Sequence, residues 1–267
     1  MTFFEREKPD PKMAIKSLHE DKPEVCHISE LLPQHPFMMT VVAPRKSGKT
    51  FMVVDMIKDN SKFRGFFDFI FVWSRSIKAD SKWKNLQLPS FSTFDHWDPV
   101  AAEKIFNTII ALHSRYPKKD CPKTLFVWDD MASSNVSSPH TQGLLERVAT
   151  TGRHFGVSAI FITQAYMRLS PTVRTNTTNM CVFRIRNAQE FSRISEENRE
   201  ALDKDEFFNL YNEVTSKPFT FLHVNNQQGD PCLRFSSCWN ERIKIPSLAT
   251  IKEEEVEEKK KKKTRTK

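Results

Sequence analysis

Glycine is scarce in this sequence. Its 267 residues include 6 glycines, where average usage of about 7% would give roughly 19. Glycine tolerates backbone conformations that other residues rarely adopt, so the positions where it does occur are informative.

Long hydrophobic runs are also missing. No apolar stretch approaches the roughly 18 to 20 residues that a membrane-spanning helix needs. The first residues, MTFFEREKPDPK, carry charges where a secretory signal would have its hydrophobic segment. We therefore expect a soluble protein that is not secreted.

Cysteine follows neither a disulfide nor a metal-binding pattern. The count of 5 is odd, with no CxxC pair and no histidine at zinc-finger spacing, which argues against a disulfide framework and a structural zinc site. We expect reduced and mostly buried thiols at Cys26, Cys121, Cys181, Cys232 and Cys238.

Hydrophobic and basic residues are plentiful. A hydrophobic content of 39%, with 22 Phe and 5 Trp, is enough for a substantial core and excludes disorder of the whole chain. Lys and Arg number 41 against 33 Asp and Glu, a formal net charge of +8. This excess suggests a polyanionic partner, but net charge alone is weak evidence until the charges are located.

From Phe37 onward, short apolar runs alternate with amphipathic stretches. Runs that are apolar on both faces and separated by helical segments are typical of buried parallel strands joined by crossover helices. The pattern predicts an α/β fold with a mainly parallel central sheet flanked by helices. The expected strands lie in HPFMMTVVA, FFDFIFVWS, KTLFVWDD, VSAIFITQ and NMCVFRI.

The chain divides into four segments. Residues 1–35 are expected to form an irregular arm and residues 36–190 the core. Residues 191–250 extend the same domain with two helices and an edge hairpin. Residues 251–267 hold an acidic block followed by five lysines, and this composition predicts a disordered tail.

The strongest motif follows the first strand, Met38–Val42. It matches the Walker A pattern GxxxxGK[ST] except at the first position, where alanine replaces glycine. Its residues are Ala43, Pro44, Arg45, Lys46, Ser47, Gly48, Lys49 and Thr50. We expect backbone N–H groups at the start of the next helix to bind the phosphates of ATP, Lys49 to reach the β- and γ-phosphates, and Thr50 to ligate Mg²⁺. The alternative is an ordinary strand-to-helix turn with a solvated lysine.

A second motif, KTLFVWDD, places two carboxylates at the end of a strand. Ligands gather at the carboxyl ends of strands in open α/β sheets, which makes Asp129 the candidate Walker B ligand for Mg²⁺. Asp130 is the candidate general base for the attacking water, and capping of the next helix is the alternative.

A polar residue also ends the strand in VSAIFITQ. Gln164 stands where it could orient the attacking water or respond to the γ-phosphate. A structural capping role is the alternative.

In this order the motifs resemble the FtsK–HerA superfamily of DNA-translocating ATPases. The elements GRHFGVSAIFITQ and LSPTVRTNTTNMCVF are most similar to those of genome-packaging ATPases of large double-stranded DNA viruses of eukaryotes, over residues 36–190. The resemblance implies a RecA-like P-loop core that assembles as a homo-oligomeric ring and drives double-stranded DNA into a preformed capsid. It further implies a capsid or portal partner, and a location in the virion or at a cytoplasmic site of virus assembly.

The resemblance also suggests two arginines that act on transition-state charge. Arg153 matches the arginine that precedes the sensor glutamine, and Arg174 matches the Arg-x-Asn element that ends in Asn176. Arg45, inside the phosphate loop, is an alternative cation from the same subunit. The sequence departs from the family at Ala43 and at Thr178, where viral relatives often have an acidic residue.

Two groups of basic residues are candidates for contacts with DNA. One candidate is the loop after the second strand, with Arg75, Lys78, Lys82 and Lys84 around Trp83. The other is the tail, where residues 252–267 carry 8 basic and 5 acidic residues. Either group could equally be solvated. The sequence therefore predicts an ATP-driven DNA-packaging motor, with another translocase or helicase, or a nucleotide-gated DNA-binding protein without turnover, as alternatives.

Overall fold

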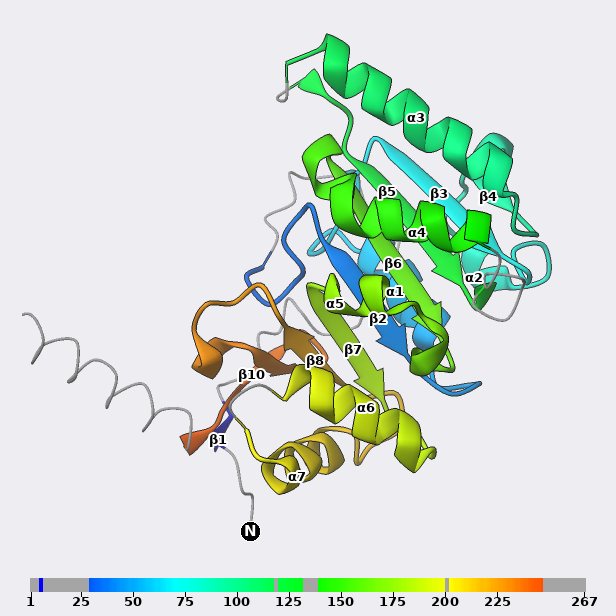
Figure 1. Cartoon of the computed structure of the whole chain (residues 1–267). Coiled ribbons are helices and arrows are strands. Elements are labelled where there is room, and N and C mark those ends of the chain that lie inside the picture. Colours follow the sequence, from blue (N-terminus) through cyan, green and yellow to red (C-terminus); the bar gives the residue numbers. More distant parts are fainter. Residues whose placement is uncertain (1–4, 7–28, 118–119, 132–138, 200–201, 247–267) are drawn as a thin grey trace, which may run out of the picture.

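A ten-stranded sheet runs through the computed structural model, which describes residues 5–6, 29–117, 120–131, 139–199 and 202–246 (Figure 1). The strands are, in spatial order, β1 (Glu5–Arg6), β10 (Glu241–Lys244), β9 (Phe235–Ser237), β8 (Phe221–Asn225), β7 (Asn179–Phe183), β2 (Met38–Val42), β6 (Val157–Thr163), β5 (Thr124–Asp129), β3 (Phe69–Ser74) and β4 (Thr93–Phe94).

The strands from β7 to β4 in this order are parallel. Every residue of β2, β5, β6 and β7 is buried, as expected for strands covered on both faces. The predicted α/β class with a mainly parallel sheet is confirmed.

Helices cover both faces of the sheet, and the sheet separates two apolar clusters. The helices are α1 (Lys49–Lys58), α2 (Ser81–Lys84), α3 (Pro99–Arg115), α4 (Pro139–Thr151), α5 (Pro171–Thr175), α6 (Ala188–Asn198) and α7 (Lys204–Val214). One apolar cluster joins the sheet to residues of α3 through α7, and the other joins it to α1 and α2. Figure 1 shows α4 and α6 in front of the sheet and α1 behind it.

Polar residues fix where several helices begin. Asp98 accepts a hydrogen bond from the Ala101 N–H at the start of α3, and Pro99 occupies the first turn. Asp203 and Glu206 form a reciprocal capping box at the start of α7. These local contacts fix the residues at which α3 and α7 begin.

The expected hairpin exists, but its predicted position at the sheet edge is wrong. Strands β8 and β9 pair antiparallel, and β8 pairs with β7. The sheet continues beyond β9 through β10 to β1, the two-residue strand Glu5–Arg6 from the arm. A strand of two residues is too short to show an alternation of apolar and polar residues. The sequence therefore does not predict this additional edge strand.

The described cysteines are free thiols. Cys121 and Cys181 are buried, Cys232 and Cys238 are half-buried, and Cys26 lies outside the described residues, as does the predicted tail, 251–267. Among the residues that the structure describes, no group of three or more His, Cys, Asp or Glu is placed to hold a metal ion. No described helix is long and apolar enough to cross a membrane.

Candidate active site

The backbone of the loop between β2 and α1 includes left-handed conformations. The Ala43 N–H still donates to the Thr163 carbonyl at 3.0 Å, so this residue continues the strand pairing with β6. The left-handed residues of the loop are Lys46, with φ 63°, and Gly48, with φ 95°. Alanine is therefore accommodated at the first Walker A position, because the turn needs its special backbone later in the loop.

Three predicted site residues meet at the carboxyl edge of the sheet. The Lys49 Nζ atom lies 2.9 Å from Asp130 Oδ2, and Gln164 Nε2 donates to the same oxygen at 2.8 Å. Lys49 opens α1, Asp130 follows β5 and Gln164 follows β6. The lysine is therefore ion-paired within the site, unlike the solvated lysine of an ordinary turn.

The backbone holds Asp130 in an uncommon conformation. Its φ of 52° is left-handed, and its N–H donates to the Ile162 carbonyl at 2.9 Å. Non-glycine residues with positive φ are rare and recur at functional sites. Helix α4 begins at Pro139, so Asp130 is not the residue that directly precedes this helix.

Asp129 is buried and held by three donors. Its Oδ2 atom accepts from Trp83 Nε1 at 3.1 Å, from Ser74 Oγ at 3.2 Å and from Thr50 Oγ1 at 3.4 Å. Burial raises the pKa of this carboxyl, and the charge of Asp130 acts in the same direction, while Lys49, Trp83 and Ser74 oppose the shift.

The other oxygen of Asp129 has the character of a metal ligand. Asp129 Oδ1 is buried without a hydrogen-bond partner among the described residues, and a buried polar atom of this kind calls for an explanation. Carboxylate and hydroxyl oxygens are the donors that Mg²⁺ prefers. Asp129 and Thr50 therefore fit a divalent cation.

Trp83 is a site residue that the sequence interpretation missed. The sequence placed it only among the basic residues of a candidate DNA-contacting loop, but it is 2% exposed and donates its indole N–H to Asp129. The apolar residues Ile77 and Leu86, on either side of it, are the signal that this segment packs inward. The surrounding cations Arg75, Lys78, Lys82 and Lys84 are exposed.

Arg153 lies at the amino-terminal ends of the parallel strands, whereas the phosphate loop lies at their carboxyl ends. It belongs to the 3₁₀ turn Gly152–Phe155, which precedes β6, whereas the loop follows the parallel strand β2. The 7 residues of β6 separate the two edges, a span of roughly 20 Å at the usual rise per residue. The exposed Arg153 side chain is not brought to the site of its own chain, whereas Arg45 lies in the loop itself.

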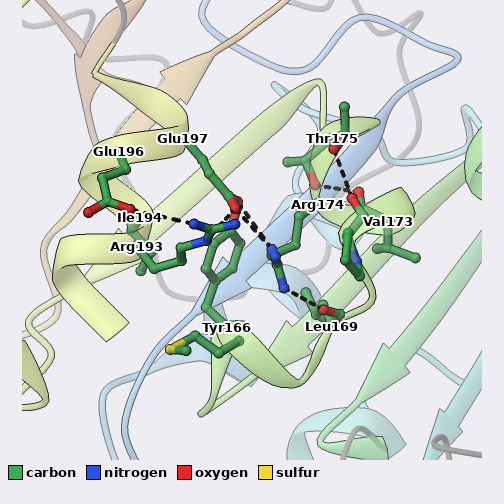
Figure 2. A network of polar contacts seen from close by, with 12 residues as sticks. Tyr166, Leu169, Val173, Arg174, Thr175, Arg193, Ile194, Glu196 and Glu197 are labelled. Atoms are coloured by element: carbon green, nitrogen blue, oxygen red, sulfur yellow. Dashed lines mark hydrogen bonds and ion pairs between the residues drawn. The ribbon is translucent and has the colours of Figure 1, made fainter. Parts of the chain in front are cut away.

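Arg174 is committed to contacts inside the fold, as Figure 2 shows. Its Nε atom lies 3.1 Å from Glu197 Oε2, and Nη1 donates to the Leu169 carbonyl at 2.8 Å. Glu197 also accepts from Tyr166 Oη at 2.6 Å and pairs with Arg193. The structure thus joins Arg174 to α6 and does not bring it to the Lys49 cluster.

A known protein family matches most of this chain. A family model described as Poxvirus A32 protein matches residues 25–206. No curated protein matches significantly.

Among solved structures, the genome packaging NTPase B204 from Sulfolobus turreted icosahedral virus 2, in complex with sulfate, superposes with a TM-score of 0.52 at 18% identity, covering 77% of this chain and 96% of that chain. The conjugation coupling protein TcpA of pCW3 gives 0.51 at 10% identity, covering 79% and 61%. The cytoplasmic domain of the type VII secretion ATPase EccC from Thermomonospora curvata gives 0.50 at 14% identity, covering 72% and 24%.

At these identities the structural likeness shows the fold alone, which is that of P-loop NTPases. The predicted resemblance to viral packaging ATPases of the FtsK–HerA superfamily is confirmed by the family match, which spans more than half of the sequence. The chain belongs to the Poxvirus A32 protein family.

Proposed function

We propose that this chain is an ATP-hydrolysing motor that drives double-stranded viral DNA into a preformed capsid. The observation that carries the proposal is the convergence of Lys49, Gln164 and Asp130 on one carboxylate oxygen, beside the buried Asp129. The family match supports a role in genome packaging. Such a motor would act in the virion or at a cytoplasmic site of virus assembly, with a capsid or portal protein as partner.

The phosphate loop supplies the ATP-binding groups. Backbone N–H groups of residues 45–50 would surround the phosphates at the start of α1, where the helix dipole favours negative charge. Thr50 and Asp129 would hold Mg²⁺, which neutralises charge on the phosphates when it is bound.

Lys49 links nucleotide binding to the chemistry. In the structure its ammonium group pairs with Asp130 at 2.9 Å. A bound triphosphate would compete for the same ammonium, and the Asp130 carboxylate would then accept a proton from the attacking water. Gln164 donates to Asp130 in the structure and would orient that water.

The arginines differ in what they can reach. Arg45 is available to phosphates bound in its own loop. Arg153, at the opposite edge of the sheet, would act on the site of a neighbouring subunit, which agrees with a homo-oligomeric ring. The internal contacts of Arg174 favour a positioning role for this residue.

DNA binding would rest on contacts to the phosphate backbone. The exposed cations Arg75, Lys78, Lys82 and Lys84 are the described candidates, although Lys78 is paired with Asp95 and Lys82 with Asp80. The basic tail, the other candidate, lies outside the described residues.

The test is steady-state ATP hydrolysis with and without duplex DNA. We expect DNA to stimulate turnover, Lys49→Ala to abolish nucleotide binding, and Asp130→Asn to keep binding while lowering turnover by about a hundredfold or more. Lys104→Ala, an exposed lysine on α3, is the control. Absence of turnover in the unaltered protein over a range of salt and Mg²⁺ would instead favour a nucleotide-gated DNA-binding protein.

A further inference from the structure

A large cavity adjoins the phosphate loop. It measures about 720 Å³, within the range of small-molecule sites, and Gly48, Lys49 and Thr50 form part of its wall. Three aromatic rings form another part: Phe51 from α1, Phe183 from the end of β7 and Phe219 from the segment before β8. Its further charged residues are Lys46, Asp80 and Lys82, and the last two are paired with each other.

Phe219 is held in a conformation that phenylalanine rarely adopts. Its φ is 64°, and its side chain is 67% exposed. A Cβ atom added to Gly48 would stand 3.2 Å from Phe219 Cδ1, so the ring lies directly against the phosphate loop. Strained backbone of this kind clusters at ligand sites. An exposed ring beside a phosphate-binding loop is suited to stack on an aromatic ligand.

The strand order tells which end of a nucleotide would meet these rings. Strand β2, which leads into the loop, lies between β6 and β7. Asp130 and Gln164, the groups for the terminal phosphate, stand on the β6 side. A triphosphate that lies across the loop therefore directs its nucleoside toward β7, where Phe183 and Phe219 are found.

We propose that Phe219 stacks on the nucleobase of the bound nucleoside triphosphate, with Phe51 and Phe183 lining the same recess. The inference rests on the proposed function, since it concerns the ligand of the same site. Stacking on an aromatic side chain recognises the flat face that all bases share, and larger rings gain more contact area. ATP and GTP therefore bind with similar affinity, and both bind more tightly than CTP or UTP.

The test separates the base from the phosphates. Binding to the full chain is measured by calorimetry for the β,γ-imido analogues of ATP and GTP and for inorganic tripolyphosphate, all with Mg²⁺. We expect Phe219→Ala to weaken both nucleotides about tenfold, from the usual 1 to 3 kcal/mol of base stacking, and to leave tripolyphosphate unchanged. Phe219→Trp retains nucleotide binding.

Phe91→Ala is the matched control, because Phe91 is 66% exposed and is not part of the cavity. Unchanged nucleotide affinity in Phe219→Ala would overturn the stacking role. Equal weakening of tripolyphosphate would also overturn it, since the ring would then act by supporting the loop. Failure of the proposed function is distinct: the unaltered protein would bind neither nucleotide nor tripolyphosphate, or Lys49→Ala would bind both as well as before.

Discussion

The two adjacent aspartates of the site are held in different ways, and the difference suits different tasks. Asp129 is the last residue of β5 and is buried; one of its oxygens accepts from three donors, and the other has no hydrogen-bond partner within the described part of the chain. Asp130 leaves the strand in a left-handed conformation and faces Lys49 and Gln164. A fixed carboxylate suits a metal ligand, whereas a carboxylate whose ion pair can be exchanged suits a base.

Trp83 should matter to the metal ligand through its single hydrogen bond. In Trp83→Phe the ring stays buried but Asp129 Oδ2 loses one of its three donors. Loss of a group that orients a metal-binding carboxylate typically costs 10- to 100-fold in metal affinity or activity. We expect the Mg²⁺ concentration for half-maximal ATP hydrolysis to rise about tenfold, with a smaller effect on thermal stability.

Trp73→Phe provides the control for this prediction. Trp73 is fully buried in the neighbouring strand β3, and its indole nitrogen has no hydrogen-bond partner among the described residues. A rise in Mg²⁺ requirement of the same size in both variants would show that the indole of Trp83 acts by packing alone.

Single site residues could be predicted where the chemistry lies within a short motif. Lys49 and Thr50 sit at fixed positions of Walker A, and Asp129 ends an unmistakable buried strand. Ser74 and Trp83 reach Asp129 from 55 and 46 residues away along the chain. Such contacts depend on tertiary packing, and no local pattern encodes them.

At the scale of elements, the carboxylate of Glu197 ties the segment after the sensor strand to α6. Tyr166, two residues beyond Gln164, donates to Glu197, and the Met167 N–H donates to Glu190 at 3.0 Å. Arg174 of α5 meets the same Glu197 carboxylate. The segment that carries Gln164 is therefore anchored to α6 at two points.

Arg174 and Arg193 share this carboxylate but should differ in their contribution to stability. Arg174 has a side chain 9% exposed, while that of Arg193 is 44% exposed. Removing one partner of a buried pair costs about 3 to 5 kcal/mol, which the partial exposure of Glu197 reduces, whereas an exposed pair contributes about 0 to 1 kcal/mol. Arg174→Ala should lower the melting temperature by roughly 5 to 10 °C and Arg193→Ala by about 2 °C or less.

Thermal unfolding and ATP turnover per folded molecule, measured together, check this prediction. Arg174→Lys should recover part of the stability by restoring a charge. If Arg174→Ala melts like the unaltered protein but hydrolyses ATP far more slowly, the structural role is contradicted. Arg174 would then act on the charge of the transition state.

Most elements could be predicted because their signals are local. Strand β2 has the predicted bounds, and α6 and α7 are the two helices expected after the last strand of the core. The position of the β8–β9 hairpin could not be predicted. An edge strand and an inner antiparallel strand differ in whether a further strand pairs with them, and a strand's own sequence does not show this. The strand that pairs with β9 here is β10, and β10 in turn pairs with Glu5–Arg6, more than 200 residues away along the chain.

For the molecule as a whole, the parallel sheet separates two sets of functional candidates. The motifs that follow a strand lie together at the carboxyl ends of the parallel strands and include Lys49, Asp130 and Gln164. Arg153 precedes a strand and therefore lies at the amino-terminal ends. The fold class follows from alternating apolar and amphipathic segments, but the strand order does not, since many orders satisfy the same pattern. That order decides which residues share a site within one chain.

The separation predicts that Arg153 acts between subunits. Lys49→Ala removes the phosphate ligand, and Arg153→Ala should lower turnover by about a thousandfold while leaving nucleotide binding intact, the usual effect of losing an arginine supplied to a phosphoryl-transfer site. Mixed in equal amounts and assembled at random, the two variants form some interfaces with both groups intact. Activity should recover to about a quarter of the unaltered level, if each interface of a head-to-tail ring works independently. Arg115→Ala, an exposed arginine that ends α3, should hydrolyse ATP normally. Mixtures no more active than the average of the two variants would show that Arg153 does not serve a neighbouring site.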